Sequence, residues 1–230
     1  MSTLSTPLKS ANIQLVIFDC DGVLVDSEGL SKRVLLQMLA DIGVVASDAY
    51  FDQHFLGRSY EAVTASIFND YSVTLPATFQ HEYQTQLLQV FAQELRPTIA
   101  LTQMLAQLTL PYCVATSSSP NRVDFALKST NLIDYFAGQV FTASEVKHGK
   151  PAPDLFLHAA KQMGMAPQNC LVIEDSQAGI EAGLAANMHV IKYAGASHLV
   201  NKAASTNDKQ DKITIIREWP ELFSYIPSAR

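Results

Sequence analysis

The chain has few of the features that mark membrane, disulfide-rich or nucleic-acid-binding proteins. Its three cysteines in 230 residues are too far apart in the sequence to suggest a disulfide framework or a cysteine-rich zinc site. No apolar run approaches the roughly 20 residues that a membrane-spanning helix needs, and residues 1–12 lack the apolar core of a secretory signal. The 16 Lys and Arg residues against 22 Asp and Glu residues give a net charge of −6, which leaves no basic stripe for a nucleic acid. We therefore expect a cytoplasmic protein, monomeric by default, with no nucleic-acid or membrane partner.

What the chain does contain is a regular alternation of two kinds of apolar segment. Hydrophobic residues make up 48% of the sequence and charged residues 17%, a composition typical of a folded protein with a sizeable core. The first kind of segment is a short apolar run rich in branched side chains, typical of a strand buried on both faces of a parallel sheet. Such runs predict strands at Ile13–Phe18, Tyr112–Ala115, Cys170–Ile173, His189–Tyr193 and Ile213–Ile216, with a weaker candidate at Gln139–Phe141.

The second kind of segment is amphipathic and predicts helices between those strands. Ser119 followed by Pro120 is typical of a helix N-terminus, because serine is a good cap and proline suits the first turn. Pro153 and Ser176 open two further helical patterns, and Gly164 is placed to end the first of them. Strands that alternate with helices of about 10–15 residues predict βαβ units. We therefore expect an α/β fold with a doubly wound, Rossmann-like parallel sheet.

One stretch interrupts this alternation. Between residues 28 and 95 no segment predicts a buried strand, whereas apolar residues recur at helical spacing, for example Leu87 and Phe91. We interpret this stretch as an inserted helical subdomain of three or more helices. The expected domains are residues 1–27 with 96–230 for the sheet and residues 28–95 for the helices. Two short crossings between the domains would form a hinge.

Two aspartates follow the first predicted strand. Asp19 and Asp21 are two positions apart, so in an extended segment both side chains point the same way, and Gly22 permits a sharp turn after them. Because ligands of open parallel sheets collect at the carboxyl ends of the strands, the two carboxylates could face one ligand. Taken alone, the pattern is equally consistent with a solvated acidic turn.

Three further segments carry polar groups that could join the aspartates. Thr116, Ser117 and Ser118 offer hydroxyl and backbone N–H groups ahead of a helix, which suits phosphate oxygens, although a capping cluster is the commoner explanation. Glu174 and Asp175 add carboxylates after another strand, where a capping role is the commoner one. Lys150 precedes two prolines that stiffen its backbone, yet an isolated lysine is usually a solvated surface charge.

Together these residues predict one site. Carboxylates that cluster at one spot repel each other and cannot all ionise without a counter-charge. A hard divalent cation supplies that charge, and Mg²⁺ fits a ligand set of carboxylate, carbonyl and water oxygens. A cation, a lysine, and hydroxyl and amide donors are also the groups that bind a phosphoryl group. The sequence therefore predicts a magnesium site that accepts a phosphoryl group.

In this combination the sequence resembles the haloacid dehalogenase-like hydrolase superfamily. The matching pieces, in the order of the family, are Asp-Cys-Asp-Gly-Val-Leu-Val-Asp-Ser-Glu from Asp19 to Glu28, Thr116-Ser117, Lys150-Pro-Ala-Pro-Asp154 and Glu174-Asp175. The resemblance runs from Leu15 to about His198, and it is closest to the subgroup with a helical cap inserted after the first strand. It implies a phosphatase, a phosphoric monoester hydrolase, acting on a small phosphorylated metabolite. A sugar phosphate or a sugar-acid phosphate such as 6-phosphogluconate is the implied substrate.

The resemblance also implies a role for each motif residue. Asp19 would be the nucleophile that forms an aspartyl phosphate. Asp21 would protonate the leaving group and then deprotonate the attacking water. Thr116 and the Ser117 N–H group would hold the phosphoryl oxygens, and Lys150 would neutralise charge on Asp19 and the phosphate.

Mg²⁺ is the cofactor that the same resemblance implies. Its ligands would be the carboxylate of Asp19, the backbone carbonyl of Asp21 and Asp175, with Glu174 in support. The ion would shield the negative nucleophile from the negative phosphate and align the two.

Substrate selection is implied for the helical insertion. Gly57 and Arg58 lie where the family places substrate-contacting residues, and Arg58 could pair with a carboxylate or hydroxyl groups of the substrate. A surface arginine that caps the next helix explains the same residue equally well. Lys32 and Arg33 are further candidates, since one of them could face the cleft.

Two alternatives stay open on the sequence. A phosphosugar mutase of the β-phosphoglucomutase type shares the core and the aspartate pair, but its pattern has a histidine twelve residues after the nucleophile, where this chain has Ser31. A non-catalytic ligand-binding protein on the same fold is the alternative from another class, because fold alone does not fix function. The presence of both aspartates together with Lys150 and Asp175 favours the enzyme.

Overall fold

The computed structural model describes residues 11–55, 60–200 and 213–226, and the chain divides into two compact units. The sheet unit comprises the residues up to Asp26 together with those from Arg96 onwards. The helical unit comprises Ser27–Leu95. The chain therefore leaves the sheet unit after its first strand and returns to it before the second.

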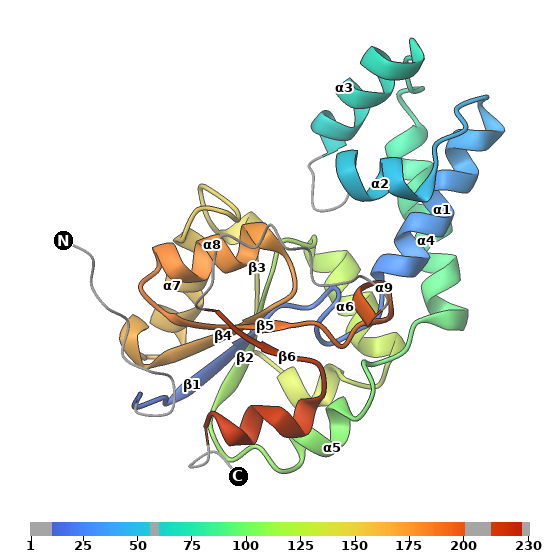
Figure 1. Cartoon of the computed structure of the whole chain (residues 1–230). Helices are drawn as coiled ribbons and strands as arrows, with labels where there is room; N and C mark the ends of the chain where they lie inside the picture. The colour runs from blue at the N-terminus through green and yellow to red at the C-terminus, as the bar shows by residue number, and fades with distance from the viewer. Residues whose placement is uncertain (1–10, 56–59, 201–212, 227–230) are drawn as a thin grey trace. The chain divides into compact units, whose positions relative to one another are not determined.

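A parallel β-sheet forms the centre of the sheet unit (Figure 1). Within the described residues it has six strands in the order β3-β2-β1-β4-β5-β6. The chain thus starts in the middle of the sheet and builds outwards in both directions, as a doubly wound fold does. The strands are β1 Leu15–Phe18, β2 Tyr112–Thr116, β3 Val140–Thr142, β4 Cys170–Glu174, β5 His189–Tyr193 and β6 Thr214–Ile216. The predicted α/β fold is confirmed, and each predicted strand lies within two residues of the observed one.

Helices cover both faces of this sheet (Figure 1). The α-helices of the sheet unit are α5 Leu101–Leu105, α6 Pro120–Ser129, α7 Asp154–Gln162, α8 Gln177–Ala185 and α9 Ser197–Val200. Short 3₁₀ segments are η2 Ile133–Phe136, η3 Ala143–Glu145, η4 Pro167–Asn169 and η5 Trp219–Ser224. Helices α7 and α8 pack on one face, whereas α5 and η5 contact each other on the opposite face.

The predicted helix boundaries are confirmed by their capping contacts. The Ser119 Oγ accepts a hydrogen bond from the Arg122 N–H at the start of α6, and the Ser176 Oγ accepts one from the Gly179 N–H at the start of α8. Each serine thus satisfies a backbone donor that the first helical turn leaves unpaired. Gly164 follows the end of α7 with a φ of +69°, a conformation that favours glycine.

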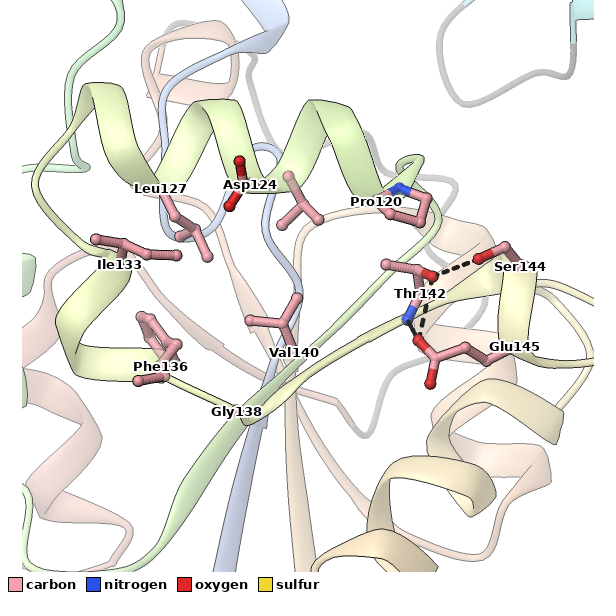
Figure 2. Close-up of a pocket in the computed structure, with 12 residues that line it drawn as sticks. Pro120, Asp124, Leu127, Ile133, Phe136, Gly138, Val140, Thr142, Ser144 and Glu145 are labelled. Atoms are coloured by element: carbon pink, nitrogen blue, oxygen red, sulfur yellow. Dashed lines mark hydrogen bonds between the residues drawn. The ribbon is translucent and has the colours of Figure 1, made fainter.

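A cavity lies beside β3 at the edge of the sheet (Figure 2). Its volume is about 330 Å³, and its lining is largely apolar. The apolar walls come from α6, through Val123 and Leu127, from η2, through Ile133 and Phe136, and from Val140 on β3.

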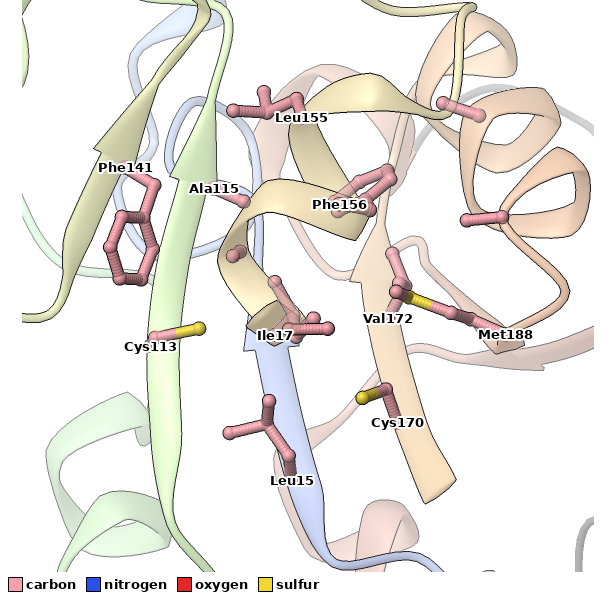
Figure 3. Close-up of a cluster of buried hydrophobic side chains, with 14 of the residues drawn as sticks. Leu15, Ile17, Cys113, Ala115, Phe141, Leu155, Phe156, Cys170, Val172 and Met188 are labelled. Carbon is pink, nitrogen blue, oxygen red and sulfur yellow. The ribbon is translucent and has the colours of Figure 1, made fainter. Parts of the chain in front are cut away.

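The core of the sheet unit has two layers because successive strand residues face opposite sides of the sheet. On the side of α7 and α8, Leu15 and Ile17 of β1 pack with apolar residues of β2, β4 and α7 (Figure 3). On the other side, the ring of Phe18 lies edge-to-face on Trp219 with centroids 5.9 Å apart. Trp219 stacks on Tyr193 at 4.4 Å and is fully buried, so the end of the described chain is fixed to the sheet.

The helical unit is built from α1 Glu28–Asp41, α2 Asp48–His54, α3 Tyr60–Tyr71 and α4 Phe79–Glu94. Its described residues contain no strand, as the sequence predicts. Helices α1 and α4 pack against each other, and their predicted apolar stripes are buried, as at Leu39, Leu87 and Phe91. Helix α2 was not predicted as a separate element, although Ser47 caps it by accepting a hydrogen bond from the Tyr50 N–H.

In the part of the chain that the structure describes, no helix is both long enough and apolar enough to cross a membrane.

Candidate active site

The predicted acidic residues meet because three neighbouring parallel strands end at the same edge. Phe18 of β1 pairs with Val114 of β2 and with Ile173 of β4. Asp19 directly follows β1, and its N–H donates to the Ile173 carbonyl at 3.0 Å. Glu174 is the last residue of β4, so β-sheet register places its side chain beside that of Asp19. Asp175 is the next residue along the chain.

Lys150 joins the two strand-end carboxylates. Its Nζ donates to the Asp19 Oδ1 at 2.6 Å and to the Glu174 Oε1 at 2.7 Å, and it also donates to the Ala115 carbonyl at 3.0 Å. The same Nζ lies 4.8 Å from the centroid of the Phe156 ring. The side chain is only 5% exposed, which excludes the explanation of a solvated surface lysine. Burial alone would lower the pKa of Lys150, but Asp19 and Glu174 hold it above its ordinary value.

Glu174 has a position that only a glycine on the facing helix permits. Its Oε2 accepts hydrogen bonds from the Ser176 N–H at 2.8 Å and from the Ser176 Oγ at 2.9 Å. A Cβ atom on Gly179, in the first turn of α8, would lie 1.7 Å from the Glu174 Oε1. The carboxylate therefore rests directly on the helix backbone. Glu174 therefore has two functions in the structure: it accepts hydrogen bonds at the start of α8, as the capping explanation predicts, and it contacts Lys150.

Asp19, Glu174 and Asp175 together form a cluster that could hold a metal ion. Each offers one carboxylate oxygen, and these oxygens lie within 4.8 Å of one another. Burial raises the pKa of Asp19, Lys150 lowers it, and repulsion from Glu174 and Asp175 raises it further, so that it stays well above its ordinary value. With all three carboxylates ionised, Lys150 leaves an excess of two negative charges. A hard divalent cation, which prefers carboxylate oxygens, fits both this charge and this donor set.

Asp21 has partners different from those of Asp19. Its Oδ1 accepts a hydrogen bond from the Arg122 Nη2 at 2.8 Å, and its Oδ2 accepts one from the Ser118 Oγ at 2.5 Å. Cys20 lies between the two aspartates and is 1% exposed, as the alternation of side chains predicts. The two carboxylates of the motif are therefore held by two different cations.

The hydroxyl segment after β2 lies at the same edge of the sheet. Thr116 is the last residue of the strand and is buried, and its Oγ1 accepts a hydrogen bond from the Ser118 N–H at 3.1 Å. Ser117 is exposed. Because α6 begins directly after Ser119, this loop leads into a helix N-terminus, which is a common position for phosphate oxygens.

Three contacts near the cluster were not predicted. Arg122 and Ser118 contact Asp21, and His198 has its Nε2 3.4 Å from the Asp175 Oδ2. The sequence could not show these contacts, because each of the three residues is far from its partner along the chain. The only sequence signal is that Ser118 belongs to the predicted phosphate-binding segment, although its contact with Asp21 was not predicted.

The residues predicted to select the substrate all fall within residues 27–95, the helical unit. Gly57 and Arg58 lie outside the described residues. The Lys32 Nζ lies 2.8 Å from the Asp48 Oδ2, and the Arg33 Nη2 lies 2.7 Å from the Glu94 Oε1. Lys32 and Arg33 therefore have partners within the helical unit.

The cavity beside β3 (Figure 2) is a separate feature, since neither the three clustered carboxylates nor Lys150 lines it. Its two acidic lining residues are already engaged: Asp124 pairs with Lys128, and Glu145 accepts a hydrogen bond from the Thr142 N–H.

A doubly wound parallel sheet with clustered carboxylates and a buried lysine at its C-terminal edge defines an enzyme-like site. The chain belongs to the haloacid dehalogenase-like hydrolase family, whose model matches residues 13–187. The resemblance predicted from the four motifs is thereby confirmed.

Two curated relatives and one solved structure are particularly similar. The 6-phosphogluconate phosphatase of Escherichia coli (strain K12) is 29% identical over 214 residues, which cover 93% of this chain and 96% of the relative. Hexitol phosphatase A of the same organism is 33% identical over 190 residues, covering 76% and 80%. A haloacid dehalogenase-like protein from Agrobacterium tumefaciens matches with a TM-score of 0.83 and 32% identity, covering 94% of this chain and 98% of that one.

The relatives named phosphatases confirm the prediction of an enzyme that hydrolyses phosphoric monoesters.

Proposed function

We propose that the protein is a Mg²⁺-dependent phosphatase that hydrolyses a small phosphorylated sugar or sugar acid through an aspartyl-phosphate intermediate. The observation that carries the proposal is the Lys150 ammonium group placed between Asp19 and Glu174, beside Asp175. This arrangement keeps a buried carboxylate next to a positive charge at the edge where parallel sheets bind ligands. The names of the curated relatives support the class of substrate.

Asp19 is the nucleophile in this proposal. One of its oxygens forms a bond to phosphorus while the bond between phosphorus and the substrate oxygen breaks. Asp21 gives its proton to the departing oxygen, so that an alcohol leaves rather than an alkoxide. Asp21 then takes a proton from a water molecule whose oxygen attacks phosphorus, and Asp19 regains its carboxylate as inorganic phosphate departs.

Lys150, Thr116 and Ser117 bind the transferred group. The Lys150 ammonium neutralises charge on Asp19 and on a phosphoryl oxygen, which would otherwise repel each other. The Thr116 hydroxyl and the Ser117 N–H group donate hydrogen bonds to the remaining oxygens. Because Lys150 is anchored by Glu174 and the Ala115 carbonyl, it needs no rearrangement to act.

Mg²⁺ would be held by the Asp19 carboxylate, the Asp21 backbone carbonyl and Asp175, with Glu174 in support. When bound, it supplies positive charge that shields the nucleophile from the phosphate. The fit rests on the excess of negative charge in the cluster and on its all-oxygen donor set.

Selection of the substrate is assigned to residues 28–95, acting as a cap over the core of residues 1–27 and 96–230. Gly57 and Arg58 are the proposed substrate contacts in that segment. A guanidinium group there would suit a sugar acid, because it can bind a carboxylate with two hydrogen bonds.

The test is phosphate release from p-nitrophenyl phosphate, 6-phosphogluconate and a hexitol phosphate, measured with and without Mg²⁺. We expect turnover that needs Mg²⁺ and a higher kcat/KM for one of the sugar compounds than for the aryl ester. Asp19→Asn should reduce kcat at least about 1,000-fold while the far-UV circular dichroism stays unchanged. Asp124→Asn, on the exposed face of α6, is the matched control and should keep full activity.

Metal binding without turnover of any phosphoester would instead favour a non-catalytic ligand-binding protein. Full activity of Asp19→Asn would refute the assigned nucleophile. Conversion of one phosphorylated sugar into an isomer, with no phosphate released, would favour the mutase.

A further inference from the structure

We infer that Arg122 and Ser118 are positioning residues that hold the Asp21 carboxylate apart from Asp19 and aim it at the leaving-group oxygen. The inference rests on the proposed function, in which Asp21 is the proton donor. It adds Arg122 of α6 and Ser118 of the loop before it to the residues that the family motifs supply.

The contacts occupy both oxygens of Asp21. The Arg122 Nη2 donates to Oδ1 at 2.8 Å, and the Ser118 Oγ donates to Oδ2 at 2.5 Å. The side chains of Asp21 and Arg122 are 16% and 26% exposed, so solvent competes little with the pair. Two donors on two different oxygens fix the rotation of a carboxylate, whereas one donor would leave it free to turn.

The local backbone gives Arg122 a defined starting point. Ser119 caps α6 by accepting a hydrogen bond from the Arg122 N–H, and Pro120 occupies the first helical position. The capping contact and the proline together fix the first turn from which the guanidinium extends. Ser118 is held in a similar way, because its N–H donates to the Thr116 Oγ1. Both donors to Asp21 therefore stand on well-defined backbone.

The separation of the two aspartates has a chemical reason. Asp19 must approach phosphorus, whereas Asp21 must approach the oxygen that leaves, which lies on the opposite side of the phosphorus in an in-line attack. If Lys150 attracted both carboxylates, one of them would be misplaced, and a misplacement of about 1 Å can cost about 100-fold in rate. In the structure the Lys150 ammonium donates to the carboxylates of Asp19 and Glu174, whereas the Arg122 guanidinium donates to that of Asp21.

Leaving-group dependence distinguishes positioning of Asp21 from a general structural role. A p-nitrophenolate group leaves without a proton, whereas a sugar alkoxide needs one. The ratio kcat/KM covers the steps up to formation of the phosphoenzyme, so it reports on the first proton transfer. A residue that only maintains the fold would lower kcat/KM for both substrates by the same factor.

The experiment compares Arg122→Ala, Arg122→Lys and Ser118→Ala on p-nitrophenyl phosphate and on a sugar phosphate that the enzyme turns over. For Arg122→Ala we expect kcat/KM to fall about 100-fold on the sugar phosphate and less than about 5-fold on the aryl ester. Arg122→Lys should recover part of the loss, because lysine keeps the charge but not the planar donor geometry. Ser118→Ala should also lower kcat/KM more on the sugar phosphate than on the aryl ester, but by a smaller factor than Arg122→Ala. Lys128→Ala, further along α6, is the control and should change neither value.

Equal losses on the two substrates would overturn the inference. Asp21→Asn, measured in parallel, separates this result from a failure of the proposed function. If Asp21→Asn itself shows no leaving-group dependence, Asp21 is not the proton donor, and the error lies in the mechanism assigned under the proposed function. If Asp21→Asn shows it and the Arg122 and Ser118 variants do not, only the inference fails. Should Arg122→Ala lose its fold in circular dichroism, Arg122→Lys and Ser118→Ala decide the question.

Discussion

At the scale of single residues, Lys150 is the side chain on which the electrostatics of the cluster depend. A buried ammonium is costly unless its donors are satisfied, and here two carboxylates and a backbone carbonyl satisfy them. The carboxylates of Asp19 and Glu174 are buried as well, so they in turn need the positive charge of the ammonium. Removing the ammonium would leave two buried carboxylates without the positive charge that now lies between them.

We expect Lys150→Met to lower both activity and stability. The kcat for any phosphoester should fall about 100- to 1,000-fold, since the charge that faces the phosphoryl group is lost. The free energy of unfolding at pH 7 should fall by about 3–5 kcal/mol, the usual cost of leaving buried charges without a partner. Lys161→Met, at an exposed position of the same region, is the control and should cost less than about 0.5 kcal/mol.

The stability loss of Lys150→Met should depend on pH. Burial and the neighbouring carboxylates raise the pKa of Asp19. A carboxyl whose pKa is raised by folding contributes its full stability below its unfolded pKa and loses it as the pH rises. Without Lys150 to oppose this effect, the deficit should be largest at pH 7 and shrink towards pH 4. Urea unfolding of both proteins at several pH values measures it, and a deficit independent of pH would contradict the account.

Single residues were predictable where they belong to a motif and unpredictable where they only contact one. Asp19, Glu174 and Asp175 follow strands, so the parallel topology alone predicts that they meet. The residues next to Lys150 in the sequence do not predict that it is buried. Only the combination of the four motifs indicated that Lys150 belongs to the site. Arg122 and Asp21 are 101 positions apart in the sequence, so no local sequence pattern can predict their contact.

At the scale of elements, the turn from β4 into α8 determines where Glu174 can lie. The carboxylate accepts hydrogen bonds from Ser176, the cap of α8, and rests on Gly179 in its first turn. One short connection therefore terminates a strand, caps a helix and orients the partner of Lys150. A side chain at position 179 would disturb all three.

We expect Gly179→Ala to displace Glu174, because the new Cβ would lie 1.7 Å from its Oε1 and 1.9 Å from its carboxyl carbon. The free energy of unfolding should fall by about 1–3 kcal/mol, as is usual for overpacking. The kcat should fall as well, since Lys150 loses an anchor. Gly149→Ala is the matched control: its Cβ would meet its nearest neighbour at 3.7 Å, an ordinary contact. Equal effects of the two substitutions would show that the contact with Glu174 is unimportant.

Elements were predictable in proportion to the apolar surface they bury. Strands β1 and β4 are buried along their whole length, and α6 and α8 combine an apolar stripe with a capping serine, so both signals agreed. Helix α2, with seven residues, and α9, with four, were not predicted as separate elements. Such short elements bury too few side chains to show a period, and their formation depends on tertiary contacts.

At the scale of the whole molecule, the chain is one sheet unit interrupted by one helical unit. The insertion follows β1, so the segment that carries Asp19 and Asp21 leads directly into the helical unit. The absence of a strand pattern between residues 28 and 95 made such an insertion predictable. The choice of substrate was not predictable, because Gly57 and Arg58, the residues proposed for it, belong to no periodic apolar pattern in the sequence from which a shape could be predicted.

Binding of Mg²⁺ should change the stability of the whole chain. Three carboxylates with one ammonium destabilise the folded state without a cation, and a cation that binds only the folded state stabilises it by mass action. At 100 times its dissociation constant, Mg²⁺ would add about 2.7 kcal/mol, which corresponds to a rise in Tm of roughly 5–10 °C for a chain of this size. Thermal unfolding with Mg²⁺ and with a chelator measures the shift.

Asp175→Asn makes this prediction specific to the cluster. Repulsion from Asp175 is one of the causes that raise the pKa of Asp19, so the variant should be at least as stable as the wild type in chelator. It should be less stable than the wild type in Mg²⁺, because one of the proposed ligands has lost its charge. The order of the two Tm values therefore reverses when the ion is added, whereas Asp124→Asn, with an exposed carboxylate, should leave the Mg²⁺ shift unchanged. A substitution that merely damaged the fold would lower the Tm in both conditions, and a Mg²⁺ shift that persists in Asp175→Asn would place the ion elsewhere.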